Sequence, residues 1–156
     1  MEDHQFYGNM AILAALRSED PHCKVGCIIV DKSSNIIGKG FNRFPRGIDL
    51  PYIKSPEKSE DDKRHFIIHA EQDAILHHTS KVKNSTLYTT RYPCNECAKI
   101  IIEMQIKKVY YITEKQNEAY HLAKKLFEKS KVEIEQLELD ISISHDKIDK
   151  VVAYHK

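Results

Sequence analysis

Two short segments of the chain carry side chains that can bind a metal ion. His69 and Glu71 flank Ala70 in the first segment, and Cys94 and Cys97 form a C-x-x-C pair in the second. Two thiolates at that spacing and one imidazole make a three-ligand set for Zn²⁺, which leaves one tetrahedral position open. An open position is typical of a catalytic zinc, which can activate water as a nucleophile. The pattern therefore predicts a zinc-dependent hydrolase.

Both segments are predicted to lie at the beginnings of helices. Helical apolar patterns run over 69–78 and 94–105, and a proline directly before Cys94 suits a helix start. The free N–H groups and the dipole of a helix start favour thiolates over thiols. His69 and Glu71 are two residues apart, so they can face one site only in a first, irregular turn. Glu71 is then expected to act as the proton shuttle.

Other interpretations of the same residues remain open. A closed zinc site would need a fourth protein ligand, for which Cys23 and His65 are available, although neither lies at ligand spacing from Cys94. The two cysteines could also be buried without a metal ion. Glu71 favours the catalytic interpretation, because a closed structural site needs no general acid or base.

The elements expected around these segments alternate between helix and strand. Apolar spacing predicts helices over 4–16, 69–78, 94–105 and 117–129, and strands over 25–30, 36–42, 86–90, 108–113 and 132–137. The irregular stretch 44–64 contains three of the five prolines and is expected to be a long surface loop. This alternation predicts an α/β sheet with parallel crossovers. The tail over 142–156 is ambiguous, and a final helix would fit it.

Composition limits the class of protein and its partners. With 156 residues, the chain fits a single domain, and its 41% hydrophobic and 30% charged residues are ordinary for a soluble protein. The formal net charge of +1 predicts no nucleic-acid partner. The acidic start and short apolar runs predict neither a signal peptide nor a membrane span. We therefore expect a cytoplasmic protein, in which four cysteines indicate metal binding or burial.

The chain resembles the deoxycytidylate (dCMP) deaminases of the cytidine deaminase superfamily. The resemblance runs from about Phe6 to Leu137 and is carried by RSEDP at 17–21, VGCIIV at 25–30, GFNRFP at 40–45, HAEQDAI at 69–75 and PCNECAKIII at 93–102. H-x-E followed by P-C-x-x-C is the signature of zinc deaminases. The resemblance implies a single domain over 1–156, with the tail 140–156 outside it. It also implies a three-layer α/β fold, with a five-stranded mixed sheet between helices, and a homo-oligomer (hexamer or dimer).

The resemblance also implies a reaction, a cofactor and a substrate site. The reaction is hydrolytic deamination of dCMP to dUMP and ammonia with Zn²⁺, which feeds dTMP synthesis. By resemblance, Arg17 contacts the substrate phosphate and Asn42 the deoxyribose hydroxyl. An arginine fork suits a phosphate, and an amide suits a hydroxyl. The other pocket residues expected by resemblance are Ala70, Thr90, Tyr92 and Pro93.

Two departures from the family pattern leave the substrate open. Arg43 stands where the family has glycine, and with Arg46 it could contact a further phosphate or an effector. The segment 114–118 is shorter than its counterpart and lacks the expected tyrosine. The alternatives are therefore deamination of dCTP or of another cytosine or nucleobase compound, and a catalytically inactive zinc-stabilised regulatory or scaffold protein.

Overall fold

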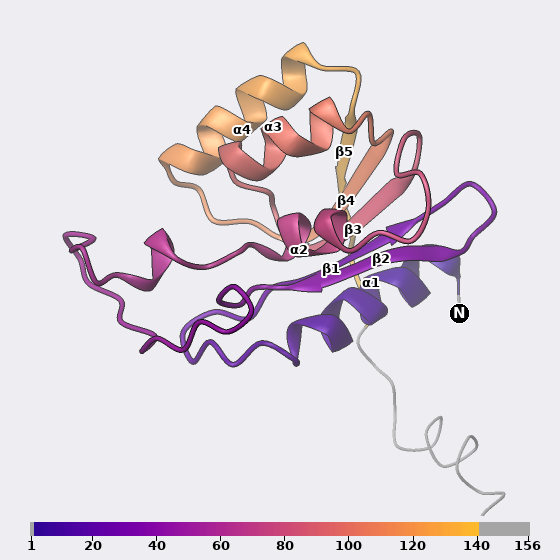
Figure 1. Ribbon diagram of the computed structural model, residues 1–156. Helices are drawn as coiled ribbons and strands as arrows, with labels where there is room; N and C mark the ends of the chain where they lie inside the picture. The colour runs from indigo at the N-terminus through magenta and orange to yellow at the C-terminus, as the bar shows by residue number, and fades with distance from the viewer. Residues whose placement is uncertain (1, 141–156) are drawn as a thin grey trace, which may run out of the picture.

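Five strands form one mixed sheet in the computed structural model, which describes residues 2–140 (Figure 1). The strands follow the order β2-β1-β3-β4-β5 across the sheet. Strand β1 is antiparallel to β2 and β3, whereas β3, β4 and β5 are parallel to one another. The strands span Gly26–Val30 (β1), Ile36–Phe41 (β2), Thr86–Arg91 (β3), Lys108–Thr113 (β4) and Glu133–Gln136 (β5).

Helices cover both faces of this sheet and give three layers (Figure 1). The helices are α1 (Asp3–Ala15), α2 (Ala70–Leu76), α3 (Asn95–Glu103) and α4 (Glu118–Lys129), with a short 3-10 helix, η1 (Lys63–His65). Helix α1 packs on one face, against β1, β2 and β3. Helices α2, α3 and α4 lie on the other face, where α3 packs along α4. The expected α/β fold, a five-stranded mixed sheet between helices, is confirmed.

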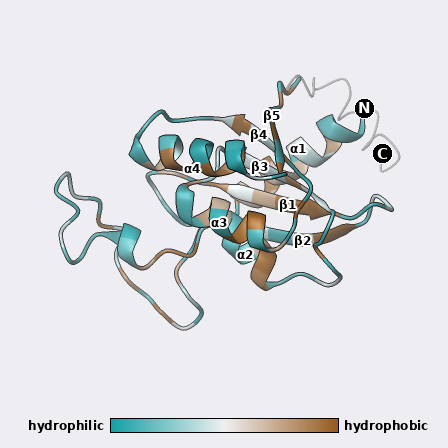
Figure 2. Cartoon of the chain, turned by 90° about the horizontal axis from the view of Figure 1, so that it is seen from above, coloured by the Kyte–Doolittle hydropathy of each residue, from teal (hydrophilic) through white to brown (hydrophobic). Residues whose placement is uncertain are grey.

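Two apolar clusters hold the layers together. Neighbouring strand residues point to opposite faces, so Ile29 joins the cluster under α2, α3 and α4 whereas Ile28 joins the cluster under α1. Figure 2 shows brown along much of β1 and β2 and much teal on the loop that projects from the body. The middle of the sheet is therefore buried between the helical layers, whereas its edge strands β2 and β5 are partly exposed.

Close backbone contact fixes the start of α2 on β2. A Cβ atom added at Gly40 would lie 2.2 Å from the carbonyl oxygen of Ala70, so a larger residue would push the helix away. The carboxylate of Asp73 accepts a hydrogen bond from the N–H of Phe41 at 3.2 Å and pairs with Arg43 at 2.6 Å. These contacts fix the position of the first turn of α2 relative to β2.

The predicted elements agree with the observed ones to within two residues at every end. The stretch 44–64 is a loop, as expected, except that its last residues enter η1. A single bridge between Arg43 and Ile68 closes its base. Among the described residues, no helix is long and apolar enough to span a membrane. The helix suggested for 142–156 lies outside the described residues.

Candidate metal centre and active site

His69 and Cys94 each stand directly before the first residue of a helix. Both have extended backbones, with φ and ψ of −73° and 156° at His69 and of −72° and 171° at Cys94. The chain therefore turns into α2 and α3 at these two residues. The N–H of His69 donates to Oε1 of Gln72 at 2.9 Å, which closes the start of α2. The prediction that both metal-binding segments lie at helix starts is confirmed.

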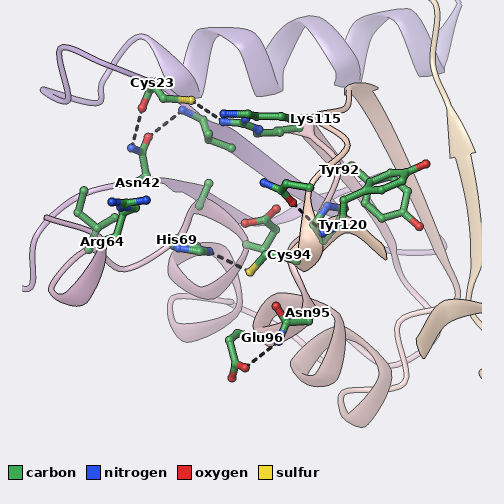
Figure 3. A pocket seen from close by; sticks show the side chains of 18 of the residues that line it. Cys23, Asn42, Arg64, His69, Tyr92, Cys94, Asn95, Glu96, Lys115 and Tyr120 are labelled. Carbon is green, nitrogen blue, oxygen red and sulfur yellow. Dashed lines mark hydrogen bonds between the residues drawn. The ribbon is translucent and has the colours of Figure 1, made fainter. Parts of the chain in front are cut away.

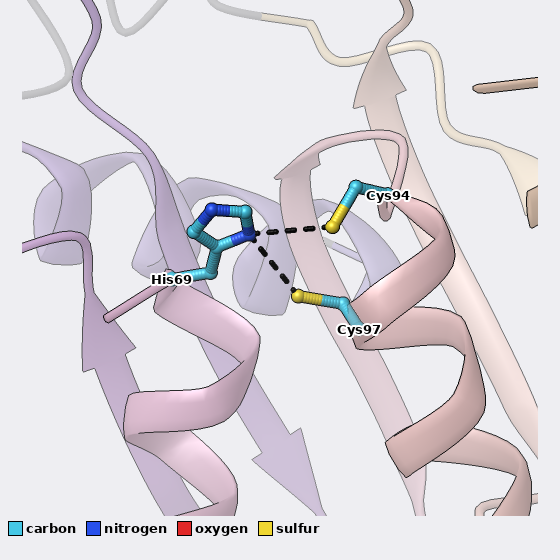
Figure 4. A group of neighbouring side chains, drawn as sticks. All are labelled: His69, Cys94 and Cys97. Atoms are coloured by element: carbon cyan, nitrogen blue, oxygen red, sulfur yellow. Dashed lines mark hydrogen bonds between the residues drawn. The ribbon is translucent and has the colours of Figure 1, made fainter. Parts of the chain in front are cut away.

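The imidazole of His69 and the thiols of Cys94 and Cys97 converge on one point (Figure 4). Nδ1 of His69 lies 3.4 Å from the Sγ atom of each cysteine. The three ligand atoms all lie within 4.8 Å of one another. One nitrogen and two sulfurs form a donor set that suits Zn²⁺. The group can therefore hold a metal ion.

The two residues considered as a fourth ligand are engaged elsewhere. Sγ of Cys23 accepts a hydrogen bond from Nη1 of Arg91 at 2.9 Å. The exposed ring of His65 lies 3.4 Å from the carbonyl oxygen of Lys58. Within residues 2–140, the only group of this kind is the three-membered one, so a fourth position is left for a water molecule or a substrate atom.

The pKa values of the two thiols are shifted in opposite directions. A hydrogen bond from the thiol of Cys97 lowers the pKa of Cys94 to about 4; burial opposes this, and the His69 ring adds to it. The same bond, together with burial, raises the pKa of Cys97 above its ordinary value. The thiol of Cys94 therefore ionises more readily than an ordinary cysteine thiol. A thiolate is the form that binds a metal ion.

Glu71 places a carboxyl group directly beside these ligands. Its side chain is buried, with 4% of the residue exposed. Oε1 accepts a hydrogen bond from the hydroxyl of Thr89 at 3.3 Å, and Oε2 accepts one from Sγ of Cys97 at 3.5 Å. Burial raises the pKa of Glu71, against the opposing charge of His69. A carboxyl group whose pKa is moved towards neutrality is suited to both taking and giving a proton.

A pocket of about 660 Å³ opens over this group. His69, Glu71 and Cys94 lie on its floor, and the loop before α2 and the connection from β4 to α4 supply its walls. Figure 3 shows Arg64 and Lys115 on opposite sides of this opening. The arrangement can admit a polar molecule, hold it over a metal ion and move a proton beside it.

The comparison with known proteins decides the family. Residues 1–113 match the family described as the cytidine and deoxycytidylate deaminase zinc-binding region. The chain belongs to this family. The family is zinc-binding, which agrees with the ligand set described above.

Deaminases of this family are also the relatives in sequence and structure. The chain is 35% identical over 139 residues to a probable deoxycytidylate deaminase of Caenorhabditis elegans, covering 88% of this chain and 71% of the worm protein. It is 37% identical over 123 residues to the deoxycytidylate deaminase of Homo sapiens, covering 76% and 69%. The solved dCMP deaminase of cyanophage S-TIM5, in complex with dCMP and dUMP, superimposes with a TM-score of 0.71 at 28% identity, covering 85% of this chain and 95% of that chain.

Asn42 lines the pocket of this deaminase, with its amide already held by the protein. Its Oδ1 accepts from the N–H of Val25 at 2.7 Å, and its Nδ2 donates to the carbonyl oxygen of Cys23 at 2.8 Å and to Asp20 at 3.3 Å. Both amide hydrogens are therefore used, and one lone pair of Oδ1 is left. Asn42 can offer a ligand an acceptor, which is what a sugar hydroxyl needs.

Three predicted contacts lie away from the metal group. Arg17, Arg43 and Arg46 line a second hollow, between α1 and β2. The guanidinium of Arg17 lies over the ring of Phe41, 5.4 Å from its centroid. Arg43 donates from both Nε and Nη2 to Asp73, at 3.1 and 2.6 Å. The structure thus does not bring these arginines together with His69 and Glu71.

The remaining predicted residues divide between pocket and sheet. Ala70, Tyr92 and Pro93 line the pocket. Thr90 belongs to the sheet: its Oγ1 accepts from the N–H of Gly26 at 3.1 Å. The ring of Tyr92 meets the ring of Tyr120 at 4.6 Å, edge to face.

Several pocket residues were not predicted from the sequence. Tyr120, in the first turn of α4, supplies an aromatic ring to the wall, although the tyrosine expected in 114–118 is absent. Arg91, Lys63 and Lys115 supply cations. The position of Arg91, at the end of a strand that leads into the metal loop, was the one available signal.

Proposed function

We propose that this chain hydrolyses dCMP to dUMP and ammonia with Zn²⁺ held by His69, Cys94 and Cys97. The observation that carries this proposal is the buried carboxyl of Glu71 beside that ligand set, on the floor of an open pocket. The names of the sequence relatives and the nucleotides bound to the cyanophage enzyme support dCMP as the substrate.

Glu71 moves the protons of the proposed reaction. Zinc, when bound, supplies a Lewis acid that activates water for attack on the ring carbon that carries the amine. Glu71 takes a proton from the attacking water, passes it to the ring nitrogen, and assists the departure of ammonia. The hydroxyl of Thr89 holds one carboxylate oxygen at 3.3 Å, so the other oxygen is oriented towards the ligand set.

The walls of the pocket bind and orient the nucleotide. Ala70 is the first residue of α2, and N–H groups at a helix start have no acceptor within the helix. We expect this N–H to donate to the carbonyl oxygen of the base. The remaining lone pair of Asn42 accepts the deoxyribose hydroxyl, and Tyr92 and Pro93 pack against the ring.

An ultraviolet assay of the zinc-loaded protein tests the proposal, with deoxycytidine, dCMP and dCTP in parallel. We expect dCMP to be the preferred substrate, and Glu71→Gln to lower kcat about a hundredfold or more with unchanged zinc content. Glu103→Gln, an exposed change at the end of α3, is the matched control. Full activity of Glu71→Gln would refute the mechanism. No turnover of any of the three by the zinc-bound protein would refute the function and favour the inactive scaffold.

The wider setting is also part of the proposal. We expect a cytoplasmic enzyme that supplies dUMP for dTMP synthesis, acts as a homo-oligomer (hexamer or dimer) and binds no nucleic acid. A net charge of +1 supports the last point. Leu13 and Leu16, 57% and 65% exposed at the end of α1, support a contact with a second copy. Light scattering measures the oligomer size.

A further inference from the structure

Arg91 lies on the same side of the sheet as the catalytic carboxylate. Side chains two residues apart in a strand point to one face, and Thr89 of β3 contacts Glu71 through its hydroxyl. Arg91 is the last residue of that strand and lines the pocket. Its side chain therefore reaches the pocket from the end of β3.

Cys23 holds this guanidinium next to Asn42. Sγ of Cys23 accepts from Nη1 of Arg91 at 2.9 Å, while the carbonyl oxygen of the same residue accepts from Nδ2 of Asn42 at 2.8 Å. Arg91 and Asn42 are thus joined through a single residue. An arginine has five N–H donors, so four of those of Arg91 remain for a ligand beside the proposed sugar contact.

Charge pairing distinguishes Arg91 from two of the other cations of the pocket. Lys63 forms an ion pair with Asp20, and Arg64 pairs with Asp62 at 2.7 Å. Arg91 has no carboxylate partner in the described part of the chain, where its side-chain contact is the thiol of Cys23. A half-buried guanidinium without a counter-ion favours an anionic ligand.

A second cation lies on the same side of the pocket. Thr113 of β4 is the register partner of Arg91 in β3, and Lys115 follows it by two residues. Figure 3 shows Lys115 on the side of the pocket where Cys23 lies. Like Arg91, Lys115 has no ion pair among residues 2–140.

We propose that Arg91, assisted by Lys115, binds the phosphate of the nucleotide and sets the preference for dCMP over deoxycytidine. The proposal rests on the proposed function and refines its substrate site. It differs from the contact implied by resemblance, because Arg17 lines the other hollow. Cys23 acts as a positioning residue, which holds one edge of the guanidinium so that the opposite edge faces the phosphate.

Two substrates that differ only in the phosphate test this assignment. In zinc-loaded protein, Arg91→Leu is expected to lower kcat/KM for dCMP at least about tenfold, and to change kcat/KM for deoxycytidine less than about threefold. Arg91→Lys keeps the charge but loses the two-pronged guanidinium. Its kcat/KM for dCMP should therefore lie between those of Arg91→Leu and of the unsubstituted protein. Lys115→Gln should lower the dCMP value about threefold, because an exposed cation contributes less. Lys125→Gln, on the exposed surface of α4, is the control.

Binding of the product keeps this test separate from turnover. Calorimetry with dUMP and deoxyuridine should show weaker dUMP binding in Arg91→Leu and unchanged deoxyuridine binding. An unchanged ratio of dCMP to deoxycytidine activity, or of dUMP to deoxyuridine affinity, would overturn the phosphate role while leaving the proposed reaction intact. If the unsubstituted chain turns over neither substrate, the proposed function fails, and the dUMP titration still decides the role of Arg91. If Arg91→Leu does not fold, the same measurements on Arg91→Lys and Lys115→Gln test the phosphate role.

Discussion

Removing the amine of Lys63 should destabilise the protein far more than removing a typical lysine from the same loop. Lys63 and Asp20 form an ion pair in which 5% and 1% of the residues are exposed. Lys63→Met leaves a buried carboxylate without its counter-ion, a change that typically costs about 3–5 kcal/mol. Asp20 keeps hydrogen bonds from the N–H groups of His22 and Cys23 and from Nδ2 of Asn42. These bonds reduce the expected loss to about 2–3 kcal/mol.

The loss should depend on pH in a defined direction. Burial raises the pKa of Asp20, but the Lys63 amine and the N–H groups of His22 and Cys23 outweigh it, so the pKa lies below its ordinary value. A carboxyl with a lowered pKa stabilises the fold above its unfolded pKa, near 4, and this contribution is lost as pH falls through the folded pKa. The difference between Lys63→Met and the unsubstituted protein should therefore be full at pH 7 and shrink in acid, as pH falls towards the lowered folded pKa of Asp20 in the unsubstituted protein.

Urea unfolding followed by far-ultraviolet circular dichroism measures this difference. Lys54→Met is the control, because Lys54 is exposed on the same loop and has no ion pair among the described residues. All three proteins keep the same metal ligands, so loss of zinc in acid affects them alike. If Lys63→Met and Lys54→Met agree within about 0.5 kcal/mol, or if the difference is equal at pH 7 and pH 3, the reasoning about the buried pair is wrong.

Two further predictions concern the metal ion and the helix that carries Glu71. A chelator should lower the melting temperature of the zinc-loaded protein. Cys94→Ser should abolish this shift, because a serine hydroxyl is a poor zinc ligand. An equal shift in both proteins would argue against zinc at this group. Gly40→Ala should lower the free energy of unfolding by about 2 kcal/mol or more, since its Cβ would lie 2.2 Å from the carbonyl oxygen of Ala70; a neutral effect in urea unfolding would show that α2 can shift at no cost.

The metal group was predictable because its information is local. His69 and Glu71 on one segment, and Cys94 and Cys97 on another, each reveal their role by spacing, and apolar periodicity places both segments at helix starts. Strand and helix limits followed from the same periodicity. The metal ligands and the element limits are thus both determined by residues that are close together in the sequence.

Asn42, Tyr92 and Pro93 of the pocket wall were expected by resemblance, but other parts of the wall were not predictable. Cys23 and Arg91 are 68 residues apart, and the pairing of β1 with β3 brings the loop of Cys23 beside the end of β3. Arg17 has the residue type expected of a phosphate contact, but the direction of α1 sends its side chain to the ring of Phe41. Tyr120 lies in a helix, and a sequence pattern does not say which turn of that helix reaches the pocket. These placements depend on how distant elements pack.

The site combines two kinds of structure that can change independently over evolution. Its reactive groups start helices that rest on a buried sheet, so few substitutions there leave a working centre. Part of its wall comes from the segments 44–65 and 114–117, which are largely loop and contribute little to the core. Loops accept insertions and exchanges at low cost. A lineage can therefore acquire a new amine-bearing substrate by remodelling these two segments, while the deaminating centre is inherited unchanged.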